Sequence, residues 1–104
     1  METKAQHDSP RIYVACLAAY NAGNLHGEWI NADQEPHEIR ADIQSMLEKS
    51  PEPFAEEWAV HDYEGFGFIS LNEGPDIERV STLAKLIVTH GKPFLLWYQN
   101  QDGH

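Results

Sequence analysis

The sequence is poor in cysteine. Cys16 is the only cysteine among the 104 residues, so no disulfide can form within the chain, which agrees with a reducing compartment. It lies inside an apolar run, and no basic residue flanks it to activate the thiol. We therefore expect Cys16 to be a small buried side chain rather than a reactive one.

Long apolar runs are absent as well. No window approaches the 18 apolar residues of a membrane span, and the N-terminal stretch METKAQHDSP has no apolar signal region. The sequence therefore predicts neither a membrane partner nor export, and we expect a cytoplasmic protein.

Basic residues are scarce. Seven Lys and Arg stand against 17 Asp and Glu, which gives a formal net charge of −10. The excess is confined to residues 28–78, where fourteen acids face only Arg40 and Lys49; residues 1–27 are neutral and residues 79–104 carry +2. Nucleic acid and anionic membranes would repel such a chain, so we expect no direct nucleic acid binding. The charge favours a basic protein surface as partner.

Catalytic fingerprints are also missing. We find no nucleophile elbow, phosphate-binding loop, dinucleotide fingerprint, zinc spacing or calcium loop. The groups weighed for a metal site or for acid–base or nucleophilic catalysis are His61 with Glu57, Asp62 and Glu64, the further histidines His26, His37 and His90, and Ser70 or Ser81 beside His61. Their spacings are arbitrary, so we predict no enzyme, no metal and no cofactor.

What the chain does contain is enough apolar material for a core. Hydrophobic residues make up 41%, and Trp29, Trp58 and Trp97 are spread along the length. This is the composition of one globular domain, or of two tightly packed subdomains, rather than of a disordered acidic tail.

The first half of the chain predicts a β-hairpin. Residues 11–20, RIYVACLAAY, are typical of a strand covered on both faces, NAGN at 21–24 is a turn, and residues 25–32 resume as a strand. Alternation in this second strand places Trp29 in the core and Glu28 towards water.

A helix and a third strand follow. Pro36 begins a helix predicted over 36–49, in which apolar residues recur at helical spacing. A strand is predicted over 56–64, with Trp58 and Val60 facing the core and Asp62 at the end of the same face. In the glycine-aromatic run behind it, we expect Phe66 and Phe68 to hold the loop against the core while Gly65 and Gly67 supply the turn.

The last third is predicted to be helical. An amphipathic helix starts at Pro75 and ends at Gly91, and the segment KPFLLWYQN after it forms a short helix in preference to a strand. We therefore predict an α+β fold in which a three-stranded antiparallel sheet, built as hairpin, helix and third strand, is followed by a small helical segment. The predicted organisation is a flexible arm at 1–10, a ββαβ subdomain at 11–70 and a helical subdomain at 71–104 packed on it.

The acidic residues of 28–78 fall on outward faces of these elements, so a continuous negative patch is predicted. A solvated surface that serves solubility alone is the plain alternative. The candidate partner-binding residues are Glu28, Asp33, Glu35, Glu38, Asp42, Glu48, Glu52, Glu56, Glu57, Asp62, Glu64, Glu73, Asp76 and Glu78.

Three stretches of the sequence resemble a known family. RIYVACLAAYNAGNLHGEWINA at 11–32, EEWAVHDYEGFG at 56–67 and GKPFLLWYQN from Gly91 are similar to the ArdA-type antirestriction proteins, with the likeness running from about Arg11 to Gln99. The resemblance implies a DNA mimic that occupies the DNA-binding cleft of type I restriction-modification enzymes, with the fourteen acids as phosphate substitutes. A generic acidic interaction module that binds another basic protein is the alternative.

The resemblance also sets two expectations about length and charge. Longer family members are expected to continue past His104 through a segment that carries a homodimer interface, so the dimer is not transferred to this chain. DNA carries one charge per about 1.7 Å of axis, and a chain of this size is expected to span roughly 35 Å, so fourteen acids match about twenty phosphates in order of magnitude.

Overall fold

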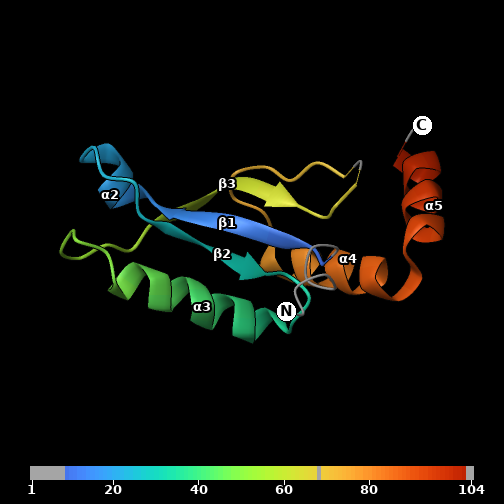
Figure 1. Ribbon diagram of the computed structural model, residues 1–104, viewed down its shortest axis with the longest axis horizontal. Helices are drawn as coiled ribbons and strands as arrows, with labels where there is room; N and C mark the ends of the chain where they lie inside the picture. The colour runs from blue at the N-terminus through green and yellow to red at the C-terminus, as the bar shows by residue number, and fades with distance from the viewer. Residues whose placement is uncertain (1–8, 68, 103–104) are drawn as a thin grey trace, which may run out of the picture.

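The computed structural model describes residues 9–67 and 69–102. A three-stranded sheet has the order β2-β1-β3, with both neighbouring pairs antiparallel. The predicted α+β fold of hairpin, helix, third strand and helical segment is confirmed. In chain order the elements are β1 (Arg11–Cys16), α2 (Leu17–Asn21), β2 (Gly27–Asn31), α3 (Pro36–Glu48), β3 (Trp58–Glu64), α4 (Ile77–His90) and α5 (Lys92–Asp102), as Figure 1 shows.

Two predictions fall on residues outside this description. Most of the predicted arm belongs to residues 1–8, and the predicted core contact of Phe68 also lies outside the described residues. The division into subdomains at 70 and 71 stays a prediction. Apolar residues from both sides of that point belong to one buried cluster.

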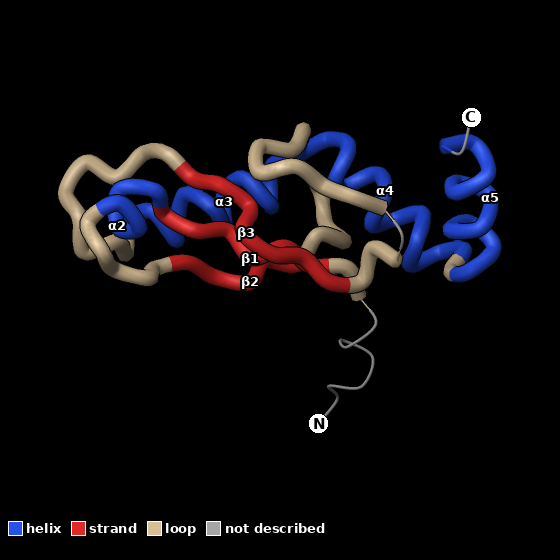
Figure 2. Tube along the Cα trace, turned by 90° about the horizontal axis from the view of Figure 1, so that it is seen from above, coloured by secondary structure: helices blue, strands red, loops and turns tan. Residues whose placement is uncertain are grey.

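One face of the sheet is covered by helices, and the other is not. In Figure 2 the strands lie along one side of the molecule, with α3 and α4 behind them. Burying the apolar side chains of the covered face is the main source of stability, since each large side chain contributes about 1.5–3 kcal/mol. The buried residues there are Ile12, Val14, Cys16 and Ile30 from the sheet, Ile39, Ile43, Met46 and Leu47 from α3, and Ile77, Val80, Leu83, Ala84 and Ile87 from α4.

Helix ends follow local chemistry. At the start of α3, Pro36 occupies the first turn, and Glu35 and Glu38 form a reciprocal capping box. Asp76 caps α4 by accepting a hydrogen bond from the Glu78 amide, and α4 ends at Gly91, whose φ of 64° is in the region that favours glycine. The predicted helices over 36–49 and from Pro75 to Gly91 are confirmed to within two residues.

The first predicted strand is too long. β1 ends at Cys16, and Leu17–Asn21 forms the short helix α2 instead of continuing the strand to residue 20. Leucine and alanine are strong helix formers, and the amide of Ala22 donates to the carbonyl oxygens of Ala18 and Ala19. The hairpin is therefore closed by a helical turn, with Gly23 at a φ of 88°, rather than by a tight NAGN turn.

The predicted sidedness of the second strand is wrong. Ile30 is buried opposite Ile12, whereas Trp29 lies on the uncovered face opposite Tyr13 and keeps 37% of its surface exposed. Glu28 lies on the helix side, where its carboxylate accepts from Lys49 at 3.3 Å. The groups that share a face were predicted correctly, but the aliphatic Ile30, not the larger Trp29, completes the core.

The third strand is confirmed, but its alternation is interrupted. Tyr13 pairs with Asp62 while its neighbour Val14 pairs with Val60, so His61 is an extra residue in a β-bulge. The bulge shifts the alternation by one residue. Asp62 therefore lies on the uncovered face, contrary to the prediction that it shares the face of Val60, and Tyr63 packs against the core instead.

The glycine-aromatic loop behaves as predicted at Phe66. This side chain is 1% exposed and is held between Gly65 and Gly67, whose φ angles are 84° and 60°. A Cβ on Gly65 would stand 2.8 Å from the Cα of Pro10, so a side chain there would push apart two backbone segments. The loop is thus tied both to the core and to the start of β1.

An ion pair joins the two long helices, and a hydrogen bond joins α4 to the turn before α3. Arg40 of α3 donates to Glu78 of α4 at 2.8 Å, and the Ser81 hydroxyl donates to the carbonyl oxygen of Gln34 at 2.7 Å. The hydrogen bond from Arg40 lowers the pKa of Glu78 to about 2, and the same bond raises the pKa of Arg40. Both side chains are more than half exposed, so the pair contributes modestly to stability.

Replacing Phe66 by alanine tests the buried loop anchor. We expect Phe66→Ala to lower the free energy of unfolding by about 3–5 kcal/mol, because it leaves a cavity in the core. Phe54→Ala is the matched control, since Phe54 is 93% exposed and its loss should change stability by no more than about 0.5 kcal/mol. Urea unfolding followed by circular dichroism measures both, and equal losses would contradict the packing described.

The Arg40–Glu78 pair predicts a dependence of stability on pH. Because the pKa of Glu78 is about 2 in the folded chain and ordinarily 4.5, the stabilisation is complete above about pH 5 and is lost as the pH falls from about 4.5 towards 2. The melting temperature of wild type should exceed that of Glu78→Gln at neutral pH, and the difference should shrink over that range. Glu48 is exposed and has no ion pair within the described part of the chain. The difference in melting temperature between wild type and Glu48→Gln should therefore not shrink over that pH range.

Candidate functional site

None of the fourteen candidate acids is buried. Eleven are exposed, and Glu28, Asp33 and Glu52 are half-buried. This agrees with the cost of placing an unpaired carboxylate in a core, which is several kcal/mol. The same elements therefore supply the core and the acidic surface, and Glu28, which lies on the helix side of β2, is one of the half-buried acids.

Four of these acids are neutralised by basic residues. Glu28 pairs with Lys49 at 3.3 Å, Glu64 with Arg11 at 2.8 Å, Glu78 with Arg40 at 2.8 Å, and Glu35 with Lys85. The hydrogen bond from Lys85 holds the pKa of Glu35 below its ordinary value. Within the described residues, ten acids have no such ion pair: Asp33, Glu38, Asp42, Glu48, Glu52, Glu56, Glu57, Asp62, Glu73 and Asp76.

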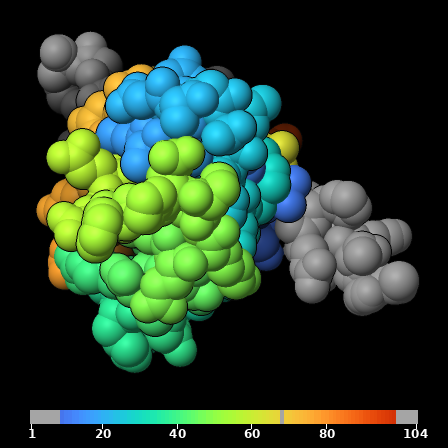
Figure 3. Space-filling view, turned by 90° about the vertical axis from the view of Figure 1, so that its left-hand side faces the viewer, coloured from blue at the N-terminus to red at the C-terminus, as the bar shows by residue number. Residues whose placement is uncertain are grey.

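The first group of unpaired acids follows α3 and the connection after it. Glu38, Asp42 and Glu48 project from the half of α3 that faces away from the core, and Gln34 orients Asp42 by a hydrogen bond of 2.8 Å. The connection over 49–57 then adds the acids Glu52, Glu56 and Glu57. Figure 3 looks at this end of the molecule, where the connection lies between α2 above it and α3 below it.

The other acids lie elsewhere. Asp62 and Glu64 project from the uncovered face of β3, on the opposite edge of the sheet from β2, against which α3 packs. Glu73 lies beside β3, since its carbonyl oxygen accepts from the amide of Val60, and Asp76 caps α4. The last turn of α3, with Glu48, and the connection over 49–57 thus lie together at one end of the molecule, whereas Glu38 and Asp42 lie further along α3 and the other acids lie on further sides.

The surroundings of His61 do not resemble a catalytic or metal centre. Its ring meets Tyr20 edge-on at 5.1 Å, in a hollow also lined by Tyr63 and Glu73. The buried Ser81 hydroxyl donates to a backbone carbonyl, and Ser70 is exposed. No group of three or more metal-ligating side chains occurs in residues 9–67 and 69–102.

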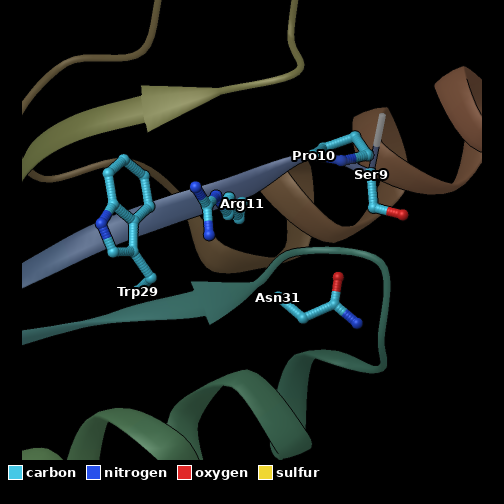
Figure 4. Close-up of a pocket in the computed structure, with 5 residues that line it drawn as sticks. All are labelled: Ser9, Pro10, Arg11, Trp29 and Asn31. Atoms are coloured by element: carbon cyan, nitrogen blue, oxygen red, sulfur yellow. The ribbon is translucent and has the colours of Figure 1, made fainter. Parts of the chain in front are cut away.

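The sequence reasoning missed an aromatic cluster on the uncovered sheet face. The Arg11 guanidinium lies 4.4 Å from the centre of the Trp29 ring, and Tyr13 meets Trp29 edge-on at 5.5 Å. Figure 4 shows Arg11 and Trp29 beside a hollow of about 300 Å³ that Ser9, Pro10 and Asn31 also line. The polar residues that alternate with Ile12 and Val14 in β1 were a signal that one face of this strand is not fully covered.

The described helices give no sign of a membrane span. None of them combines the length and the apolar composition that crossing a bilayer requires.

Comparison with known proteins places the chain in a family. A search of curated proteins returned no match. The family model described as antirestriction protein (ArdA) matches residues 12–103, which is nearly the whole chain and includes all fourteen candidate acids. The family assigned from the resemblance of the three stretches is therefore confirmed, and the chain belongs to the ArdA antirestriction protein family.

Proposed function

We propose that this chain inhibits type I restriction-modification enzymes by imitating the DNA backbone and occupying their DNA-binding cleft. The observation that carries the proposal is the set of ten exterior carboxylates without a basic partner in the described part of the chain, on a protein of net charge −10. Membership of the antirestriction family supplies the biological context.

The dimensions of the molecule suit such a role. Its principal extents are 44 × 38 × 23 Å, and the longest corresponds to about thirteen base pairs at 3.4 Å per step. The charge density is lower than that of DNA, which would carry about 26 phosphates over this length.

The acids at the α3 end are the best phosphate substitutes. Glu48, Glu52, Glu56 and Glu57 follow one another along the chain, and within the described residues their carboxylates make neither ion pairs nor hydrogen bonds. They are therefore free to face Lys and Arg of a partner. Because surface charges are screened over about 8 Å at physiological ionic strength, the affinity should fall steeply with salt.

The mechanism needs no chemistry from the inhibitor. In this proposal the chain acts in the cytoplasm, is not an enzyme, holds no cofactor, and binds the enzyme rather than nucleic acid. A homodimer of longer relatives stays a prediction.

Charge reversal tests the proposal. The quadruple variant Glu48→Lys, Glu52→Lys, Glu56→Lys and Glu57→Lys changes the charge at each site from −1 to +1 and should weaken binding on the order of a hundredfold at low salt, because several ionic contacts are lost together. Glu57→Lys alone should cost less than about fivefold, since one exposed charge is worth little. The measurement is displacement of a labelled duplex from a purified type I methyltransferase at two salt concentrations.

The control is the exchange Arg40→Glu with Glu78→Arg, which keeps both the net charge and an opposite-charge pair. It should displace the duplex as wild type does. A wild-type chain that binds the methyltransferase without displacing the duplex would instead support the generic acidic interaction module. A single reversal that abolished displacement would point to a discrete site.

A further inference from the structure

The uncovered face of the sheet has a defined pattern of side chains. Strand register places Trp29, Tyr13 and Asp62 in one row across β2, β1 and β3, and Asn31, Arg11 and Glu64 in the next. Neighbouring strands are about 4.8 Å apart, so each row spans roughly 10 Å. We name these six residues the open-face patch.

The aromatic part of the patch is held in place before any partner arrives. Trp29 is 37% exposed, with Arg11 over its ring and Tyr13 at its edge. Both Nε and Nη2 of Arg11 donate to Oε1 of Glu64, at 2.9 and 2.8 Å. Arg11 therefore links the tryptophan on β2 to the carboxylate on β3, and little side-chain freedom remains to be lost on binding.

A second exposed tryptophan lies in a different electrostatic setting. Trp97 on α5 is 56% exposed, as is Leu96, and Val88 at the end of α4 is 50% exposed. Arg79 on α4 and Lys92 at the start of α5 have no ion pair among the described residues, whereas Lys85 on α4 is paired with Glu35 and α5 ends in Asp102. This part of the chain therefore lacks the acidic excess that would attract a basic cleft.

We propose that the open-face patch is a second contact surface for the same partner, with Trp29 as its centre; this rests on the proposed function. Asp62 has no basic partner within the described residues, and the charge of Glu64 is balanced by Arg11, so the patch joins an exposed aromatic ring to an acidic strand. The surface that fits it is a basic protein cleft with apolar or planar side chains between its Lys and Arg residues.

The structure of DNA explains why a DNA-binding cleft would have apolar or planar side chains that fit the open-face patch. A duplex presents planar base edges between its two rows of phosphates, and proteins read it through both. Exposed Trp, Tyr and Arg side chains are the residue types that most often dominate binding energy at protein interfaces. The patch would therefore supply a contact that salt does not screen, in addition to the acids of the connection over 49–57 at the other end of β1, whose contribution salt does screen.

The test is displacement of duplex DNA from the type I methyltransferase by Trp29→Ala and Trp29→Leu at two salt concentrations. We expect each variant to bind about tenfold more weakly than wild type at both concentrations, with the slope of affinity against salt unchanged. Trp97→Ala, which removes the other exposed tryptophan, should bind as wild type does. Thermal melting of each variant establishes that it is folded, and Trp29→Leu keeps a large apolar side chain at this position if the alanine variant unfolds.

Hydroxyl-radical footprinting of the unmodified complex gives an independent measurement. Oxidation of Trp29 should fall when the methyltransferase is bound, whereas oxidation of Trp97 should not change. Wild-type displacement combined with unchanged affinity of folded Trp29 variants and no protection of Trp29 would overturn this inference while leaving the proposed function intact. Failure of wild type to displace the duplex would overturn both.

Discussion

Burial of only one side of the sheet is the constraint on which the rest of the structure depends. Three strands and two long helices provide enough apolar surface to cover the face of Ile12, Val14 and Ile30; α3 packs on the sheet, and α4 packs against α3 and shares its buried cluster. Carboxylates cannot follow them inward, because desolvating an unpaired charge costs several kcal/mol. The acids are consequently distributed over outward sides of α3, its following connection and β3, and the remaining sheet face is open to a partner.

Local patterns were sufficient to predict the three longer helices, but neither the short helix α2 nor which side of a strand is buried. Pro36, the capping acids and the spacing of Ile39 and Ile43 act within a few residues, so α3 could be located from the sequence. Alternation in β2 states only that Trp29 and Asn31 share a side. The choice of the Ile30 side for the core depends on pairing with Ile12 across the sheet, which no local pattern contains.

The sequence was sufficient to predict which acids are exposed, but not which of them are neutralised by ion pairs. The exposure of the fourteen acids follows from the chemistry of carboxylates, whereas their neutralisation depends on folding. Lys85 pairs with Glu35, 50 residues away along the chain, and Arg11 pairs with Glu64, 53 residues away. Both pairs neutralise acids that a count from the sequence treats as free negative charges. The Trp29 cluster was missed for the same reason, since Arg11 and Trp29 become neighbours only when β1 and β2 pair.

The bulge at His61 has a consequence for how the chain can vary in length. Val60 and Asp62 already take successive places opposite Val14 and Tyr13, so removing His61 would leave every other side chain of β3 on its present side. Removing Tyr63 would instead turn the side chain of Glu64 to the helix-covered side of the sheet. β3 can therefore lose a residue at its midpoint, a change in length that most folds confine to their loops.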